Sequence, residues 1–524
     1  MGKQSTRAPI RSAGVVGTAR REGDAGNGGD PFQTRVATST SPSGRRSERE
    51  SDGAIVPWNP GNAGGGKGPD FWRAFDDGEE WRLAMSLETP DVIRTLQRKL
   101  YRKAKAEPAY RFYMLYDKIY REDILHHAYR LARSKGGAPG VDGVTFAMIE
   151  DAGVETWLAE LRMELASKTY KAAPVRRVMI PKPGGGERPL GIPTIRDRVV
   201  QTAAKIVLEP VFEADLEENT YGYRPQRSAV DAIKQVHRLM CRGYTDVVDA
   251  DLAKFFDTIP HDALLKSVAR RIVDRHVLHL IKMWLKVPVE ERNPSGKVIM
   301  TGGKSNQRGT PQGGVVSPML SNLYMNRFLK YWRLTGRPAA FSAHVVAYAD
   351  DFVILSRGHA HEALEWTREV MTKLGLTVNE TKTSVKNARH QQFDFLGYAF
   401  GPQKLRRDGH VYLAASPSRK SVQRIKDRIG MMLRAGDKRP REKVVANLNR
   451  VLRGWANYFS HGTRMPAFRA IDHHVYDRMR NFLARRHKVE SRGTRRFSSK
   501  FIFGELGVLR LRRDHFGPRP TALR

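Results

Sequence analysis

The stretch HVVAYADDFVIL, from His344 to Leu355, decides the fold because two apolar runs flank a short polar centre. Apolar runs arranged in this way predict a β-hairpin. Its turn carries two adjacent carboxylates, Asp350 and Asp351, which the pattern predicts at a solvent-facing tip. Two close like charges repel each other, so the pair indicates a place for a divalent cation. A surface turn without function is the alternative.

A second group of acids lies upstream, in the sequence DVVDADLAKFFD from Asp246 to Asp257. Nucleotidyl transfer uses two divalent ions about 4 Å apart, and oxygen ligands from neighbouring strands suit Mg²⁺. Asp251, with Asp350 and Asp351, would supply such a cluster. The alternative is a capped strand end that happens to precede a turn.

The charge of the chain indicates a polyanionic partner. Its 524 residues carry a formal charge of +36, and from residue 402 onward Lys and Arg outnumber Asp and Glu by more than three to one. A protein that neutralises phosphates releases counterions and gains affinity, so a concentrated positive charge favours nucleic-acid binding. Solubility alone is the weaker explanation.

Cysteine and hydropathy limit the location. Cys241 is the only cysteine, which excludes internal disulfides and Cys-rich zinc sites and favours a reducing compartment. No apolar run approaches the roughly 18 residues of a membrane span, and no signal-peptide core follows Met1. We therefore expect a cytoplasmic protein without a membrane partner. The arginines of the first 20 residues leave an organelle as the alternative.

The pattern along the chain predicts an α+β fold. Residues 1–70 are rich in Gly, Ser and Arg and predict a disordered basic tail. Residues 71–135 form a predicted helical extension, with Val92, Leu96 and Leu100 on one apolar face. Short strand-like runs then alternate with helices as far as Phe400, which predicts an antiparallel sheet backed by helices. Helical periodicity returns after Ser416.

The order of motifs resembles the reverse transcriptases that group II introns encode. The resemblance runs from about Pro90 to about Arg513. It rests on GAPGVDG from Gly137, IPKPGGGERPLGIP from Ile180, YGYRP from Tyr221, DLAKFF from Asp251, GTPQGGVVSP from Gly309, YADD from Tyr348, LTVNETKT from Leu376, FLG from Phe395 and LRGWANYF from Leu452.

The resemblance implies polymerase fingers and an antiparallel palm over residues 136–405, an all-helical thumb and maturase domain over 406–513, and a basic tail over 514–524. It implies that Asp251, Asp350 and Asp351 are the catalytic residues and the ligands of Mg²⁺, with Mn²⁺ as an alternative ion. Asp249 is set aside, because the family's Asp precedes the second aromatic residue by five positions. Phe256 would then exclude a ribose 2′-OH and favour dNTPs.

The resemblance also implies contacts to the incoming dNTP. Lys182 and Arg188 would offset triphosphate charge, although an ordinary basic turn is the alternative reading. Gln312 and its glycines would approach the new base pair. Lys382 is a further candidate from the same comparison.

The last helices are expected to bind RNA. Arg450, Arg453 and Tyr458 combine cations with an aromatic ring, a composition suited to phosphates and unstacked bases. Trp455 lies on the apolar stripe, so we expect it in the core. Family members often carry a basic residue where Ala347 stands.

The expected function is an RNA-directed DNA polymerase that binds its group II intron RNA, assists splicing and copies that RNA during intron mobility. Its partners would be the intron RNA, an RNA template with a DNA primer, and target DNA, in the bacterial cytoplasm or nucleoid; the sequence leaves a homodimer open. Only a short basic tail without Cys pairs follows Lys488, so no HNH endonuclease is expected. The alternatives are a splicing cofactor without polymerase activity and a domesticated relative in DNA repair or phage defence.

Overall fold

The computed structural model describes residues 88–181, 187–292, 297–404, 408–434, 436–437, 439–491 and 493–514. Three predictions fall outside these residues: the tail over 1–70, nearly all of the tail over 514–524, and the contact at Lys182. None of the described helices combines the length and apolar character that crossing a membrane requires.

The predicted N-terminal extension is helical where it is described. Helix α2 (Asp91–Ala106) buries Ile93, Leu100 and Ala104. Val92 is exposed and Ile93 is buried in its place, so the predicted apolar face is wrong at that residue. Leu100 is buried as predicted, and Leu96 packs against the core. The helices that follow are α3 (Tyr116–Ile119), α4 (Glu122–Lys135), α5 (Phe146–Ala152) and α6 (Val154–Ala166).

A first sheet has the strand order β2-β1-β4-β5. Strands β1 (Val175–Pro181) and β2 (Glu187–Ile192) pair in antiparallel fashion, with Ile180 opposite Arg188. The other two strands are β4 (Pro288–Arg292) and β5 (Val298–Gly302). Helix α7 (Ile195–Glu213) follows β2 and packs against α2 and α4, so the strands that carry Arg188 are joined to the helical extension.

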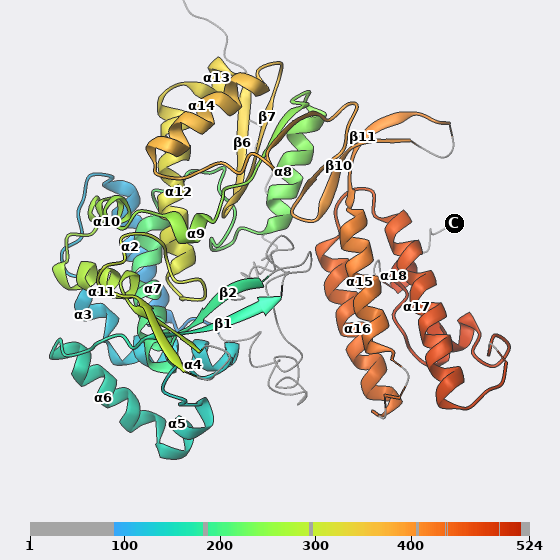
Figure 1. The fold of residues 1–524 in the computed structure, drawn as a ribbon, viewed down its shortest axis with the longest axis horizontal. Helices are drawn as coiled ribbons and strands as arrows, with labels where there is room; N and C mark the ends of the chain where they lie inside the picture. The colour runs from blue at the N-terminus through green and yellow to red at the C-terminus, as the bar shows by residue number, and fades with distance from the viewer. Residues whose placement is uncertain are drawn as a thin grey trace, which may run out of the picture. The chain divides into compact units, whose positions relative to one another are not determined.

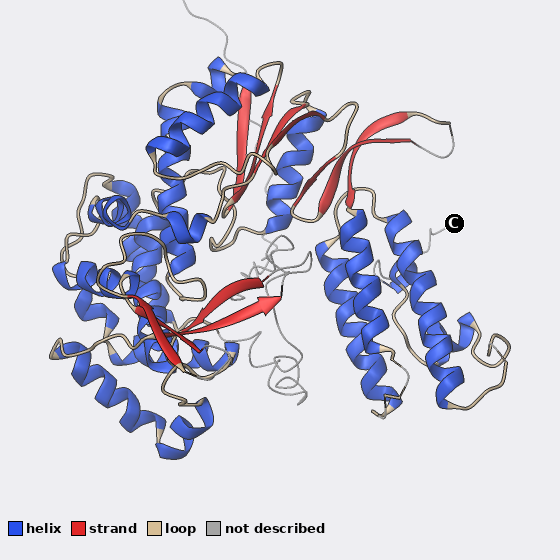
Figure 2. Ribbon diagram, viewed as in Figure 1, coloured by secondary structure: helices blue, strands red, loops and turns tan. Residues whose placement is uncertain are grey.

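The second sheet contains the predicted hairpin. Strands β6 (Ala343–Tyr348) and β7 (Asp351–Ser356) pair in antiparallel fashion. Strand β7 also pairs with β3 (Asp246–Ala250), which in turn pairs with β8 (Ser384–Asn387). Every pairing in this sheet is antiparallel, which confirms the predicted α+β palm (Figure 2).

Helices cover the two faces of this sheet. Alternate strand residues point to opposite faces, so Ala250 and Asp249 point in opposite directions. Ala250 packs in one core with α12 (Ser317–Leu334) and α14 (Ala360–Lys373), whereas Val247, on the side of Asp249, packs with α8 (Ala229–Cys241). Figure 1 shows α14 and α8 on either side of the hairpin strands. The carboxylates therefore emerge on the α8 side.

The C-terminal part begins with strands. Strands β9 (Phe393–Phe395), β10 (Tyr398–Lys404) and β11 (Val411–Pro417) form a three-stranded sheet. The expectation of an all-helical domain from residue 406 is therefore wrong for β11, whereas helices from Ser416 onward are confirmed. Those helices are α15 (Arg419–Met432), α16 (Arg441–Tyr458), α17 (Met465–Arg486), the π-helix η2 (Phe501–Glu505) and α18 (Leu511–Asp514).

Besides α12, four helices are described between β3 and β6. They are α9 (Phe255–Thr258), α10 (His261–Ala269), α11 (Arg275–Leu285) and α13 (Arg337–Ala340). Helix α9 follows Asp251 directly, so the first predicted carboxylate lies between a strand and the start of a helix.

Candidate polymerase site

The hairpin tip is a tight turn held from one side. Tyr348 lies opposite Asp351, so Ala349 and Asp350 form the loop, and Ala349 has a φ of 59°. A positive φ at the first loop residue belongs to the turns that join twisted strands, although a side chain there costs about 1 kcal/mol. The Tyr221 amide donates to the Ala347 carbonyl at 2.8 Å. A Cβ on Gly222 would overlap the Ala349 backbone.

Asp350 and Asp351 are half-buried, so the prediction of a solvent-facing tip is wrong. Tyr221 and Gly222, which contact the backbone of Ala347 and Ala349, cover the turn, and we call this pair the clamp. Burial raises the pKa of Asp351 well above its ordinary value, and the charges of Asp350 and Asp251 raise it further. Burial is also the main cause of the raised pKa of Asp350. All three predicted carboxylates therefore act on one another electrostatically.

Asp251 is placed beside them by strand register. Ala250 at the end of β3 pairs with Phe352, so Asp251 comes level with the start of β7. Its Oδ2 accepts a hydrogen bond from Asn379 Nδ2 at 2.9 Å and lies 3.1 Å from Lys382 Nζ. This carboxylate thus has a cationic and an amide partner from the loop before β8.

Asp249 belongs to the same neighbourhood. It lies 3.8 Å from Lys386 Nζ, and its charge raises the pKa of Asp351. Burial raises the pKa of Asp249 itself to about 6. It remains outside the predicted ligand set, and it adds negative charge beneath the site.

The donor set fits a divalent cation in kind. Among the described residues, no three acidic, His or Cys side chains converge closely enough to hold an ion as they stand. Asp251 is instead paired with Lys382. Asp350 Oδ1, however, is buried without a hydrogen-bond partner. A buried carboxylate oxygen without a partner is costly, and a cation would satisfy it.

Two of the predicted dNTP contacts form one hydrogen-bonded chain. Arg188 Nε donates to Gln312 Oε1 at 2.9 Å, and Gln312 Nε2 donates to Asp257 Oδ1 at 3.0 Å. The Gly191 amide donates to the Gln312 carbonyl at 2.6 Å. The positive charge of Arg188 also lowers the pKa of Asp350 against the effect of burial. This series of hydrogen bonds joins strand β2 to helix α9 next to the carboxylates.

Phe256 is only 7% exposed and packs in the hydrophobic core. Its carbonyl accepts a hydrogen bond from the Thr310 amide at 2.7 Å, which ties α9 to the segment before Gln312. The ring is therefore held by packing, and its predicted role beside the sugar stays a prediction.

The predicted RNA contacts on α16 separate into two groups. Arg450 and Arg453 are exposed. Tyr458 is half-buried, and its hydroxyl donates to the Leu396 carbonyl at 2.8 Å, so this geometry does not support its predicted contact with RNA. Trp455 is buried against Phe459, as expected.

Sequence reasoning missed several polar partners. Asp257 follows the two aromatics of its motif, yet nothing in the local pattern links it to Gln312. Asn379 stands only three positions before Lys382, in a motif from which only Lys382 was predicted to contribute. Asn322 is buried on α12 and donates through Nδ2 to the Gly222 carbonyl at 2.6 Å, which supports the clamp on the hairpin.

Two family models match the chain. Residues 180–400 match the reverse transcriptase (RNA-dependent DNA polymerase) model, and residues 422–501 match the group II intron maturase-specific domain. Protein YkfC of Escherichia coli (strain K12) is 36% identical over 59% of this chain and 88% of its own length.

Two intron-encoded proteins are also similar. The group II intron-encoded protein LtrA of Lactococcus lactis subsp. cremoris is 28% identical over 57% of this chain and 58% of its own length. The putative COX1/OXI3 intron 1 protein of Saccharomyces cerevisiae is 28% identical over 54% of this chain and 39% of its own length. The chain thus spans most of YkfC, but well under two thirds of these two relatives.

The fold and the site define a polymerase of the right-hand type with a maturase domain attached. The chain belongs to the family of group II intron reverse transcriptases, and by that membership it is an RNA-directed DNA polymerase with a maturase function. Reverse transcriptases use divalent metal ions, and the maturase domain supports RNA binding.

Proposed function

We propose that this protein binds the RNA of one group II intron, assists its splicing and copies it into DNA, with Asp251, Asp350 and Asp351 holding two Mg²⁺ ions. The observation that supports the assignment is that Asp251 and Asp350 act electrostatically on Asp351 beside the hairpin turn, where Asp350 Oδ1 is buried without a hydrogen-bond partner. Magnesium suits a set of carboxylate ligands.

When bound, a pair of divalent ions activates the attacking hydroxyl of the primer and steadies the leaving pyrophosphate. The chain's own residues do the rest. Arg188, held by Gln312, faces charge that accumulates on the triphosphate and offsets it. Lys182 would add to this from outside the described residues. Phe256 limits the room beside the sugar, which favours a deoxyribonucleotide.

The helices of the maturase domain would hold the intron RNA. Arg450 and Arg453 are exposed on α16 and free of the constraint found at Tyr458. We further propose that target DNA is reached through the ribonucleoprotein and that the protein acts in the bacterial cytoplasm. A homodimer is an additional proposal, to be tested by mass measurement in solution.

The assignment is tested with Asp350→Ala in primer extension on an RNA template with Mg²⁺. We expect dNTP incorporation to fall by about a thousandfold, equivalent to about 4 kcal/mol of transition-state stabilisation. Glu505→Ala, at an exposed acid on η2, is the matched control. Retained incorporation in Asp350→Ala would overturn the role of Asp350. Wild-type protein that aids splicing but extends no primer would favour a cofactor without polymerase activity.

A further inference from the structure

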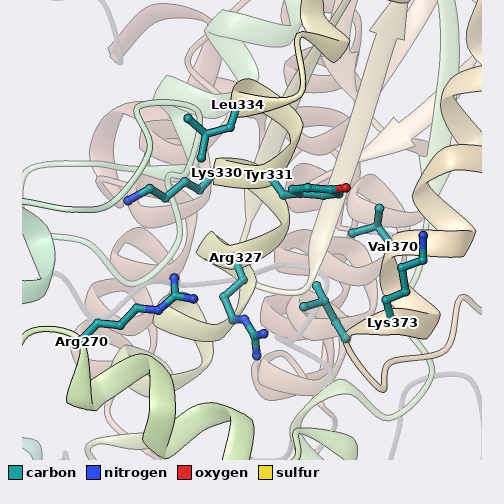
Figure 3. A pocket seen from close by; sticks show the side chains of 8 residues that line it. Arg270, Arg327, Lys330, Tyr331, Leu334, Val370 and Lys373 are labelled. Atoms are coloured by element: carbon teal, nitrogen blue, oxygen red, sulfur yellow. The ribbon is translucent and has the colours of Figure 1, made fainter. Parts of the chain in front are cut away.

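A hollow of about 390 Å³ lies among helices α10, α12 and α14 (Figure 3). Helices α12 and α14 cover the sheet face opposite to the carboxylates, so this hollow is separate from the polymerase site. Its volume is within the range of sites that bind small-molecule-sized groups. The lining residues are Arg270, Arg327, Lys330, Tyr331, Leu334, Val370, Lys373 and Leu374.

The hollow has four cations in its lining and no acid. In the described part of the chain, no ion pair involves Arg270, Arg327 or Lys330, and Lys373 only reaches Glu369 at 4.0 Å. Arg327 lies over the Tyr324 ring at 5.2 Å. Burial raises the pKa of Asp215, and the charge of Lys330 acts against that rise. Figure 3 shows the side chain of Arg270, the residue that follows α10, extending toward Arg327 of α12. Like charges gathered in this way repel, and an anion between them removes that repulsion.

Part of the lining is aromatic and apolar, and it is open to solvent. Tyr331 is 46% exposed and Leu334 is 64% exposed. The Tyr331 ring stacks on Trp366, with centroids 5.5 Å apart and planes at 18°. Stacking fixes the orientation of Tyr331, so the ring offers a rigid surface beside the cations. Fixed aromatic rings next to Lys and Arg suit an unpaired nucleobase and its phosphates.

We propose that this hollow is a second nucleic-acid site, which binds a single-stranded RNA segment outside the polymerase cleft. Phosphates lie between Arg270, Arg327 and Lys330, and a base rests against Tyr331 and Leu334. The cations come from α12, α14 and the residue that follows α10 rather than from one point, which suits successive phosphates better than one isolated anion. An acidic peptide would use the cations but would leave the aromatic surface without a purpose.

The test uses full-length protein that has first been saturated with an RNA-template and DNA-primer duplex, so that the polymerase cleft is filled. Binding of a short fluorescent oligouridylate is then followed by anisotropy at several salt concentrations. We expect Arg270→Glu with Lys330→Glu to weaken binding at least about tenfold. The slope of log affinity against log salt should fall by about 1.4, since each lost contact to single-stranded phosphate removes about 0.7.

Arg242→Glu with Arg389→Glu is the matched control, because both arginines are exposed on the palm outside the hollow. These two changes alter net charge equally and should leave both affinity and slope close to wild type. If the two double variants lose affinity equally, the effect is one of net charge, and the proposal is overturned.

Tyr331 separates RNA from an acidic peptide. Tyr331→Leu keeps an apolar contact with Trp366 but removes the aromatic face, and we expect about tenfold weaker oligouridylate binding, while Tyr331→Phe stays near wild type. Oligouridylate that carries 5-bromouridine should cross-link to Tyr331. If polyglutamate competes as well as unlabelled oligouridylate, and Tyr331→Leu has no effect, the ligand of the hollow is an acidic peptide and not RNA. Extension of the bound primer should be unchanged in every variant. Primer extension therefore tests the polymerase assignment, and oligouridylate binding tests the hollow independently of it.

Discussion

Asp257 determines which way the Gln312 amide points. A carboxylate only accepts hydrogen bonds, so it selects Nε2 of Gln312 and leaves Oε1 to accept from Arg188. We expect Asp257→Ala to free the amide, loosen Arg188 and raise the KM for dNTP. Asp257→Asn keeps an acceptor oxygen at the same place, so its effect should be smaller, about twofold.

The magnitude follows from the hydrogen bond that is lost. A bond to a charged group contributes about 1.5–3 kcal/mol when it is desolvated, and less at an exposed position. The contact between Gln312 and Asp257 is exposed, so about 1 kcal/mol is a reasonable value, and this corresponds to about fivefold in the KM for dNTP.

Single-nucleotide primer extension on an RNA template, with the dNTP concentration varied, measures this. The proteins compared are the wild type, Asp257→Ala, Arg188→Ala and the double variant. Because Asp257 acts through Arg188, its effect on KM should vanish in the Arg188→Ala background. The same fivefold increase in both backgrounds would refute the reasoning. An unchanged thermal midpoint shows that the effect is local.

Three further outcomes are expected. Gly222→Ala should lower primer extension about a hundredfold, because its Cβ displaces the Ala349 backbone, while Gly454→Ala meets nothing within 4 Å and should be fully active; an active Gly222→Ala protein would count against the clamp. His127 is 1% exposed, and burial, with Arg130 nearby, lowers its pKa to about 4, so its stabilising effect is present above pH 6.5 and is lost as the pH falls toward 4. Between pH 7 and pH 5, the free energy of unfolding measured with urea should therefore fall by about 2 kcal/mol more in the wild type than in His127→Gln, and equal losses would contradict this. Tyr458→Phe should lose about 1 kcal/mol of stability with unchanged RNA affinity, whereas weaker RNA binding at an unchanged thermal midpoint would restore the predicted contact.

The hairpin was predictable because its signal is local. Apolar runs on either side of a short polar centre define both strands, and the family motif assigns Asp251 to the same site. The burial of Asp350 was not predictable, because it depends on two residues that are distant in the chain. Gly222 lies over a hundred residues before Asp350, and Asn322 lies nearly thirty residues before it. The hydrogen bond of Tyr458 was not predictable for the same reason, since its partner Leu396 lies 62 residues away in the chain.

The charge of the site is likewise a product of tertiary contacts. Burial and mutual repulsion make the ionised carboxylates unfavourable, and two cations from distant segments reduce that cost: Lys382 beside Asp251, and Arg188 within electrostatic reach of Asp350. Neither contact reaches the partnerless Oδ1 of Asp350. Because the fixed cations leave this oxygen unsatisfied, the site retains a demand for positive charge at the point where the hairpin turn places it.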